Sequence, residues 1–459
     1  MHTVLSPNLN WHQKVWVRFD KLAGNAIKHA FKQAGFRRTK APHWNVLWSR
    51  VLHVTEFAYL NRFQKVNHFP GTWELGRKDR LHRNMAKSKR SHGAAFGVMP
   101  DTFILPRDAA DLLADVARHP GRLYIRKPLA SSRGRGVRLV RNISQLDTAK
   151  PCIVQHYISN PATIQGRKYD LRVYAALTSV DPLRVYIYED GLVRFATELY
   201  DNDQASLRRP CVHITNTSIN KHSAEYLANT GAEADGTGSK WSLRALRDHL
   251  ALLQLPWEPI WQQIKDIVAA VMIAVETKVN TLVKMHVPHP GNCFEVYGFD
   301  ILLDRDWRAW LLEVNTGPDL SSPTPLDWRV KYGMLASLMH MIGVEPYDRS
   351  EEKRADKERE ILRLTGLGQA ASPPKPAKRS ISDAANFTLS PFTPAEILPE
   401  VIRVMEAEQS RCGPWQRIFP CTEQPQRYLD MFETPRYNNI LAWEVQQQWM
   451  SKHRHDMRL

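Results

Sequence analysis

The chain has 459 residues, of which 43% are apolar and 24% charged, and its formal net charge is +16. This composition fits a folded protein of two or three domains and is unlike that of a disordered chain. No apolar run approaches the roughly 18 residues that a membrane span needs, and no signal-peptide core is present, so we expect a cytoplasmic protein without a membrane span.

The positive charge is concentrated near the start of the chain. Residues 1–50 hold nine Lys or Arg against Asp20 alone, and a second basic block runs from Arg77 to Arg90. Such a field attracts a polyanion, which could be nucleic acid, an acidic membrane surface or an acidic protein tail. A basic face that is merely solvated is an equally open interpretation for any single lysine. In this region we expect an amphipathic stretch from Val15 to Phe31, followed by a loop-rich basic segment.

Short β-rich runs separated by Gly, Pro and Asp predict strands between about 121 and 200. These runs are Leu123–Ile125, Val137–Val140, Ile153–Val154, Leu171–Tyr174 and Val185–Tyr188. The pair Asp190-Gly191 predicts a hairpin turn directly after the last run. A helical period follows from Trp241, and again from Ile260 to Val283. Two apolar strands then come, Phe299–Leu303 and Ala309–Val314, joined by a turn.

The last hundred residues predict further helices around a linker. Alternating charges predict a solvated helix over Glu351–Arg363, and the Pro-rich residues 366–391 predict a flexible linker. Pro394–Gln409 has a helical pattern, and Trp415–Trp449 is rich in aromatics. We therefore expect a docked helical extension at this end. Five widely spaced cysteines without CxxC or CxxH spacing argue for reduced thiols and against a zinc site.

Acids at the ends of the two apolar strands predict a metal site. Asp300, Glu313 and Asn315 are hard oxygen ligands that adjacent strands would bring together. Magnesium bound to ATP phosphates needs one or two carboxylates and an oxygen partner. The alternative is that Glu313 and Asn315 merely end a strand, but an acid that closes an apolar strand is costly unless it is paired or metal-bound.

A lysine followed by a Gly-rich loop predicts a phosphate-binding turn. Lys127 ends one predicted strand, and Arg133-Gly134-Arg135-Gly136 precedes the next. Glycines let backbone amides approach phosphate oxygens, and the lysine offers them a point charge. The loop is neither a Walker loop nor a dinucleotide-binding fingerprint. A Gly-rich turn between strands followed by a two-acid metal site is typical of an ATP-grasp fold.

An ordered set of longer motifs extends this interpretation. They are Asn67–Gly71, Gly76–Leu81, Gln155–Ile158, Arg167–Arg172, Asp181–Tyr186, Gly191–Ala196, His213–Asn216, Gly298–Asp300, Leu312–Asn315, Arg417–Pro420 and Phe432–Tyr437. Over roughly residues 20–450, the chain resembles the tubulin tyrosine ligase-like family, in particular its polyglutamylase branch.

The resemblance implies an α/β (α+β) ATP-grasp fold with three subdomains and a C-terminal helical extension. An N-terminal subdomain with the basic substrate-facing segment would span 15–100, a central subdomain 101–210, and a C-terminal subdomain with the metal site 211–346. A charged helix and linker would occupy 347–391, and the helical extension 392–459.

The resemblance also assigns roles to individual residues. The ATP contacts would be Lys127, Arg133, Gly134, Gln155, His156, Tyr157, Ile158, Lys168, Asp170, Thr215 and Asn216. The magnesium ligands would be Asp300, Glu313 and Asn315, and the amino-acid contacts Arg194, Thr217, Ser218, Lys240 and Lys331. Arg172 would lie near the reacting carboxyl and act in catalysis with Glu313. The family usually has Tyr where this chain has Thr217, so its amino-acid pocket would differ in size or strength.

The implied activity is that of a tubulin polyglutamylase, which uses ATP and magnesium to ligate L-glutamate onto glutamate side chains. The acidic C-terminal tails of tubulin in microtubules would meet the basic surface, with contacts at Arg77, Lys78 and Arg80. Other acidic proteins are possible substrates. The resemblance places a monomer on the cytoskeleton, in the cilium or at the basal body.

Several alternatives remain open at this level. One is a catalytically weak microtubule-binding protein that kept the fold, although its key residues are intact. Another is a family ligase that adds glycine or tyrosine. A basic nucleic-acid binder lacks any zinc-finger, RNP-type or helix-turn-helix motif in this sequence, so we expect no nucleic-acid partner.

Overall fold

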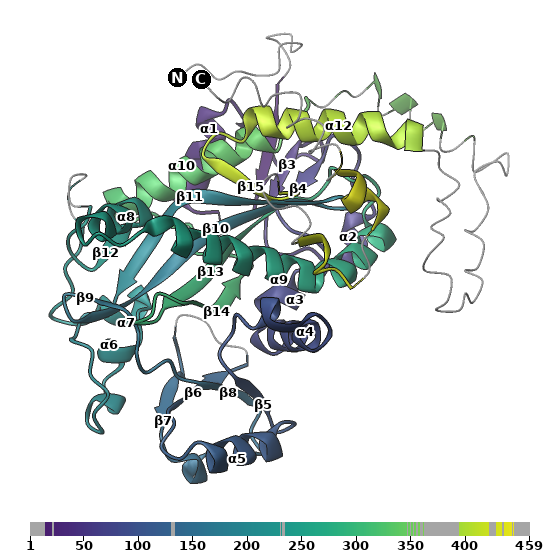
Figure 1. The fold of residues 1–459 in the computed structure, drawn as a ribbon. Helices are drawn as coiled ribbons and strands as arrows, with labels where there is room; N and C mark the ends of the chain where they lie inside the picture. The colour runs from purple at the N-terminus through teal and green to yellow at the C-terminus, as the bar shows by residue number, and fades with distance from the viewer. Residues whose placement is uncertain are drawn as a thin grey trace, which may run out of the picture.

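The computed structural model describes residues 14–20, 23–129, 134–229, 231, 235–346, 394–421, 428–433, 436–442 and 444, with isolated positions between 348 and 361. Its fold is mixed α/β with several sheets, as the sequence predicts (Figure 1). None of the described helices is both long and apolar enough to cross a membrane. The five cysteines are all free thiols.

A seven-stranded sheet forms the centre of the molecule. Its main path runs β12-β11-β10-β13-β14. The strands are β12 Lys240–Ser242, β11 Leu183–Phe195, β10 Arg167–Val180, β13 Glu295–Leu303 and β14 Ala309–Asn315, with β9 Thr163–Ile164 on β10 and β15 Trp415–Phe419 on β11. Strand β10 pairs with β13, and β11 pairs with β12. The subdomain boundary expected at residue 210 therefore separates strands that belong to the same sheet.

Strand β10 separates two apolar layers because its side chains alternate between the faces of the sheet. Leu171 and Val173 pack in one layer with the 30-residue helix α9 (Trp257–His286) and with α8 (Leu243–Leu252). Tyr174 and Ala176 pack in the other layer with α10 (Pro325–Met341) and α1 (Asn25–Gln33). The charged Lys168, Asp170 and Arg172 follow the same alternation as Tyr174, so this end of β10 carries a polar face.

Two smaller sheets flank the central one. The sheet β5-β8-β6-β7 lies below the central sheet in Figure 1 and packs against α5 (Ala109–Arg118). Its strands are β5 Thr102–Leu105, β8 Cys152–His156, β6 Tyr124–Pro128 and β7 Arg138–Val140. The sheet near the N-terminus has the order β2-β1-β3-β4, with strands β2 Arg37–Arg38, β1 Trp16–Phe19, β3 Val46–Trp48 and β4 Lys65–Val66.

Further helices complete the described fold. They are α2 Val54–Phe57, α3 Trp73–Gly76, α4 Lys78–His92, α6 Pro210–His213, α7 Thr217–Asn220 and α12 Pro394–Arg411, with 3-10 turns at Gly93–Phe96, Ile143–Gln145 and Ser206–Arg208. The predicted linker over 366–391 lies outside the described residues, and so does most of the charged helix predicted over Glu351–Arg363.

The structure corrects two predictions about local structure. Val15–Phe31 is not one amphipathic element, because its first part pairs as strand β1 and only Asn25 onwards is helical. Asp190-Gly191 is not a hairpin turn, since β11 continues through it and the chain reverses at Asp181-Pro182. A Cβ at Gly191 would lie 2.4 Å from the Arg172 carbonyl oxygen, so glycine is needed there for β10 and β11 to come this close together.

The C-terminal extension contains a strand as well as the predicted helix. Helix α12 confirms the helical pattern from Pro394, but Trp415–Phe419 forms strand β15 on β11. The indole of Trp415 is 1% exposed and donates to Ser337 Oγ on α10 at 3.0 Å. The aromatic residues therefore mark a docked segment, as expected, but part of that segment completes the sheet and is not helical.

Candidate active site

The hairpin of β13 and β14 brings the predicted metal ligands together. Asp300 pairs in register with Glu313, and Gly298 pairs with Asn315. Asn315 Nδ2 lies 3.5 Å from both Asp300 Oδ2 and Glu313 Oε1. Two apolar strands with acids near their ends therefore place two carboxylates and one amide at one edge of the sheet.

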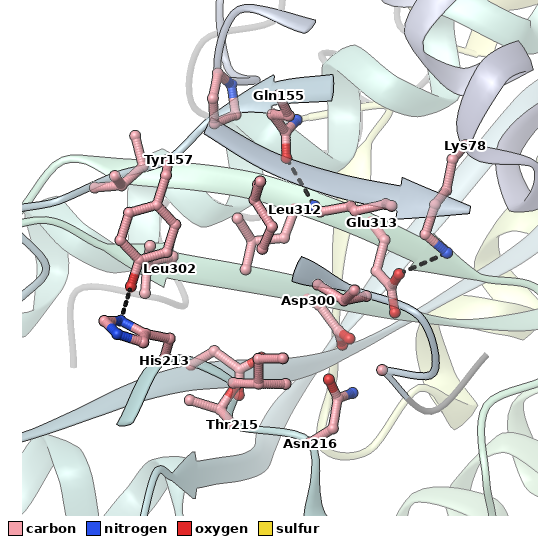
Figure 2. Close-up of a pocket in the computed structure, with 18 of the residues that line it drawn as sticks. Lys78, Gln155, Tyr157, His213, Thr215, Asn216, Asp300, Leu302, Leu312 and Glu313 are labelled. Atoms are coloured by element: carbon pink, nitrogen blue, oxygen red, sulfur yellow. Dashed lines mark hydrogen bonds and ion pairs between the residues drawn. The ribbon is translucent and has the colours of Figure 1, made fainter. Parts of the chain in front are cut away.

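Lys78, which we predicted to contact an acidic tail beside the active site, lies in the site itself. Its ammonium is 2.9 Å from Glu313 Oε2 (Figure 2). Both side chains are largely buried. Lys78 is the first residue of α4, and the preceding helix α3 packs against β14. The start of the basic segment is therefore directed inward, because it completes an ion pair with a predicted metal ligand.

Two buried arginines surround Asp300. Arg172 Nε is 2.6 Å from Asp300 Oδ1, and Arg194 Nη2 is 2.9 Å from Asp300 Oδ2. Arg194 also forms a two-point ion pair with Asp170. Burial opposes ionisation of Asp300, but Arg172 and Arg194 hold the pKa of its carboxyl well below the usual range. The four residues form a continuous charged row across β11, β10 and β13.

Two glycines give this region the space that it needs. A Cβ at Gly298 would lie 3.0 Å from Arg172 Cδ, so the glycine makes room for the arginine beside Asp300. Gly134 has a φ of +72°, and a Cβ there would lie 3.0 Å from Asn216 Oδ1. The predicted phosphate loop thus approaches Asn216 closely, which a larger residue would prevent.

A pocket of about 870 Å³, its open mouth included, lies between the central sheet and the β5–β8 sheet. Both sheets contribute walls, and Asp300 and Glu313 lie at one end (Figure 2). Of the predicted site residues, those that line it are Lys78, Lys127, Gly134, Gln155, His156, Tyr157, Ile158, Lys168, Asp170, Thr215, Asn216, Asp300 and Glu313. Lys127 donates to Gln155 Oε1 at 2.7 Å, and Gln155 Nε2 donates to Thr102 Oγ1 at 2.9 Å.

A second polar chain runs along the wall with Tyr157. Lys168 Nζ donates to the Tyr157 hydroxyl at 2.9 Å, and this hydroxyl lies 3.0 Å from His213 Nδ1. Burial and the nearby Lys168 lower the pKa of His213 to about 4, so a neutral imidazole accepts from Tyr157. His213 had no predicted role, and its place here orients Tyr157 and Lys168.

The predicted amino-acid contacts lie behind the pocket. Lys240 pairs in register with Arg194, and its ammonium is 2.6 Å from Asp327 Oδ2. Lys331 Nζ is 3.0 Å from Asp327 Oδ1. We expected a substrate carboxylate to be the natural partner of these lysines, but Asp327 already contacts both. The sequence contains a local signal for this ion pair. Thr324-Pro325 is typical of a helix start, and Asp327 and Lys331 are four residues apart in that helix, a spacing at which side chains meet.

The remaining predicted residues are dispersed. Thr217 and Ser218 begin α7 beside Asn216 and do not line the pocket. Arg77 is exposed and bonds Asp79 at 3.1 Å, while Arg80 bonds the buried Glu74. Arg133 lies outside the described residues.

The donor set fits a magnesium ion that is shared with phosphate. No group of three His, Cys, Asp or Glu that could hold a metal occurs in the part of the chain that is described. Magnesium, however, takes one or two carboxylates and completes its shell with water and substrate phosphates. Asp300, Glu313 and Asn315 supply such a set at the end of the pocket.

Comparison with known proteins shows the family of this chain. The model for the "Tubulin-tyrosine ligase family" matches residues 57–352, which is more than half of the chain, so the chain belongs to that family. Tubulin monoglutamylase TTLL4 of Homo sapiens is 35% identical over 462 residues, which cover 96% of this chain and 38% of that protein. Tubulin polyglutamylase TTLL5 of Mus musculus is 35% identical over 410 residues, 85% of this chain and 30% of that protein. Tubulin polyglutamylase ttll-4 of Caenorhabditis elegans is 34% identical over 417 residues, which cover 87% of this chain and 67% of that protein.

The chain therefore spans about two fifths or less of the mammalian relatives and two thirds of the nematode one. The family membership that the ordered motifs predict is confirmed.

Proposed function

We propose that this chain is an ATP-dependent acid–amino-acid ligase that joins L-glutamate to glutamate side chains in the acidic tails of tubulin. The observation that carries the proposal is a pocket with Lys127 and Lys168 on its walls and Asp300 and Glu313 at its end. Relatives named as tubulin glutamylases match most of the chain, which supports glutamate and tubulin as substrates. Such an activity places the protein on the cytoskeleton.

The ATP-grasp arrangement is part of this proposal. The pocket lies between two sheets, as a nucleotide clasped by two subdomains requires. The nucleotide would lie along Gln155–Ile158 and extend its phosphates past Lys127 toward Asp300. Asp300, Glu313 and Asn315 would hold magnesium, which when bound neutralises charge on the phosphates.

The chemistry that these residues would serve is the formation of an isopeptide bond. The acceptor γ-carboxylate takes the γ-phosphoryl group of ATP, and the amine of the incoming amino acid then attacks the activated carbonyl carbon and releases phosphate. Lys127 and Lys168 offset charge on the transferred group, and Arg172 orients a carboxylate close to Asp300. Arg194 binds the α-carboxylate of the incoming amino acid, using the guanidinium donors that Asp170 and Asp300 do not engage.

Helix α4 supplies a route for an acidic acceptor. Its first residue, Lys78, lies in the pocket, and its outer face exposes Arg83, Lys87, Lys89 and Arg90. A glutamate-rich tail along this face would reach the pocket at the start of the helix. Arg77 and Arg80 flank that entrance and stay proposed tail contacts.

Incubation with tubulin, ATP and labelled amino acids tests the proposal. Glutamate should be incorporated in preference to glycine, tyrosine and aspartate, and mass spectrometry should find the added mass on tubulin tails. Omission of ATP is the control and should abolish incorporation. Binding to microtubules without ATP consumption would instead identify a catalytically weak binding protein, and a preference for glycine or tyrosine would overturn the choice of glutamate.

Nucleotide binding at pH 8 should be accompanied by the uptake of about 1.4 protons. Burial lowers the pKa of Lys127 to about 8 and that of Lys168 to about 7, so in the free chain about half of the first group and about a tenth of the second are charged at this pH. Phosphates favour the ammonium form and raise both pKa values. Affinity should therefore fall as pH rises from 7 to 9.

Calorimetry in buffers of different ionisation enthalpy measures this uptake. The variant Lys127→Met should lower it by about half a proton at pH 8, since the group is half charged there. An uptake near zero in the parent chain would mean that neither lysine meets the phosphates.

A further inference from the structure

A buried acid unites the two lysines behind the pocket. Asp327 is 1% exposed, and its two oxygens contact Lys240 at 2.6 Å and Lys331 at 3.0 Å. Both lysines are themselves buried, at 6% exposure each. Three buried charges of this kind stabilise one another only in a well-defined geometry, because each would be costly alone. We call Asp327, Lys240 and Lys331 the α10 triad.

The acid of this triad is held rigidly. Thr324 caps helix α10, and its hydroxyl accepts from the Asp327 backbone N–H at 3.1 Å. The same hydroxyl donates to Asp327 Oδ2 at 2.8 Å. Asp327 therefore has its side chain and its backbone fixed by one residue, and the lysines take their positions from it.

The lysines keep donors for another group. A lysine ammonium has three N–H donors. Within the described contacts, Lys240 uses one on Asp327, while Lys331 uses one on Asp327 and one on Ser321 O at 2.5 Å. Donors therefore remain on both ammonium groups. The triad has one net positive charge, which suits a single carboxylate.

The triad continues the charged row of the active site. Lys240 pairs in register with Arg194, which reaches Asp300. The hydroxyl of Tyr174 lies close enough to interact electrostatically with Arg172 and with Asp327, and it is fully buried without a hydrogen-bond partner among the described residues. A buried hydroxyl without a partner is costly, so a polar group of a ligand bound between the row and the triad would stabilise it.

We propose that Asp327 is a positioning residue that sets amino-acid specificity by fixing Lys240 and Lys331 for the side-chain carboxylate of the incoming amino acid. The inference rests on the proposed ligase function. In this proposal Arg194 binds the α-carboxylate, and the triad, one strand further along the sheet, binds the side-chain carboxylate. The site therefore selects an amino acid by the distance between its two carboxylates. Glutamate and aspartate differ by one methylene in this distance.

Substitution of Asp327 tests this role. Asp327→Glu keeps the charge but displaces both ammonium groups, and it should raise the KM for glutamate on the order of tenfold and lower the preference for glutamate over aspartate. The KM for ATP and the kcat should stay within about twofold, since the residue contacts neither nucleotide nor reacting atoms. If thermal melting shows that Asp327→Asn is folded, this variant should likewise have a raised KM for glutamate and an unchanged KM for ATP.

Asp235→Asn is the matched control. Asp235 is also a partly buried acid that pairs with a cation of α10, Arg329, but it faces Ser242 and lies outside the triad. Its substitution should leave the glutamate-to-aspartate ratio unchanged. A folded Asp327→Glu variant with the parental KM and ratio would overturn the inference, whereas failure of the parent chain to ligate glutamate would overturn the proposed function itself.

Discussion

Replacing Glu313 by Gln should lower glutamate ligation on the order of a thousandfold without unfolding the chain. Glu313 is directly opposite Asp300 on the β13–β14 hairpin, and its carboxylate is 2.9 Å from Lys78. The amide keeps the size of the side chain and removes the negative charge that a magnesium ion requires. Incorporation of labelled glutamate into tubulin measures the activity, and thermal melting measures the fold.

Glu433→Gln is the control for this variant. Glu433 also pairs with a lysine, Lys87 of helix α4, but both side chains are more than half exposed. The same chemical change there should leave activity within about twofold, because exposed ion pairs contribute little. Near-parental ligation by Glu313→Gln with unchanged magnesium dependence would show that the metal assignment is wrong.

Replacing Glu408 by Gln should cost about 3–5 kcal/mol of the free energy of unfolding. Glu408 of α12 is 4% exposed and forms an ion pair with Arg184 at 3.0 Å. Its carboxylate also accepts hydrogen bonds from the hydroxyls of Thr178 at 3.1 Å and Tyr186 at 2.9 Å. All three partners belong to the central hairpin of β10 and β11. The variant leaves the buried Arg184 without a charged partner, and chemical denaturation measures the loss.

Glu406→Gln on the same helix provides the comparison. Glu406 is exposed two residues earlier, so its substitution should change the free energy of unfolding by less than about 0.5 kcal/mol. A chain that ends at residue 391 loses the Glu408 contacts and strand β15 together and should fail to fold cooperatively. Equal stabilities of the two point variants would contradict docking of α12 on the sheet.

Much of the site follows from local patterns in the sequence. Asp300 and Glu313 are found because two short apolar runs with a turn between them pair as a hairpin, and the register of such a pair brings their polar ends together. Gly134 was predicted because glycines let backbone amides approach phosphate oxygens, and the structure shows a positive φ at that position, which favours glycine.

The remaining features depend on contacts between distant segments. The ion pair of Lys78 with Glu313 could not be predicted, because a basic block has no local feature that turns its first residue toward an acid 235 positions away. Asp327 was overlooked because its lysine partner on β12 is far away in the sequence. Asp190-Gly191 has the local chemistry of a turn, but the close approach of β10 keeps the strand extended there.

Strand β15 has a consequence for how the protein is made. Its residues Trp415–Phe419 pair with Val185–Tyr188 of β11, so one edge of the central sheet is completed only by residues near the end of the described chain. During synthesis the earlier strands leave the ribosome first, and this edge stays open until residue 419 has emerged. An open strand edge is a template for pairing with other chains. A nascent chain therefore needs protection from aggregation until translation has passed residue 419, and premature termination before that point would leave an aggregation-prone product.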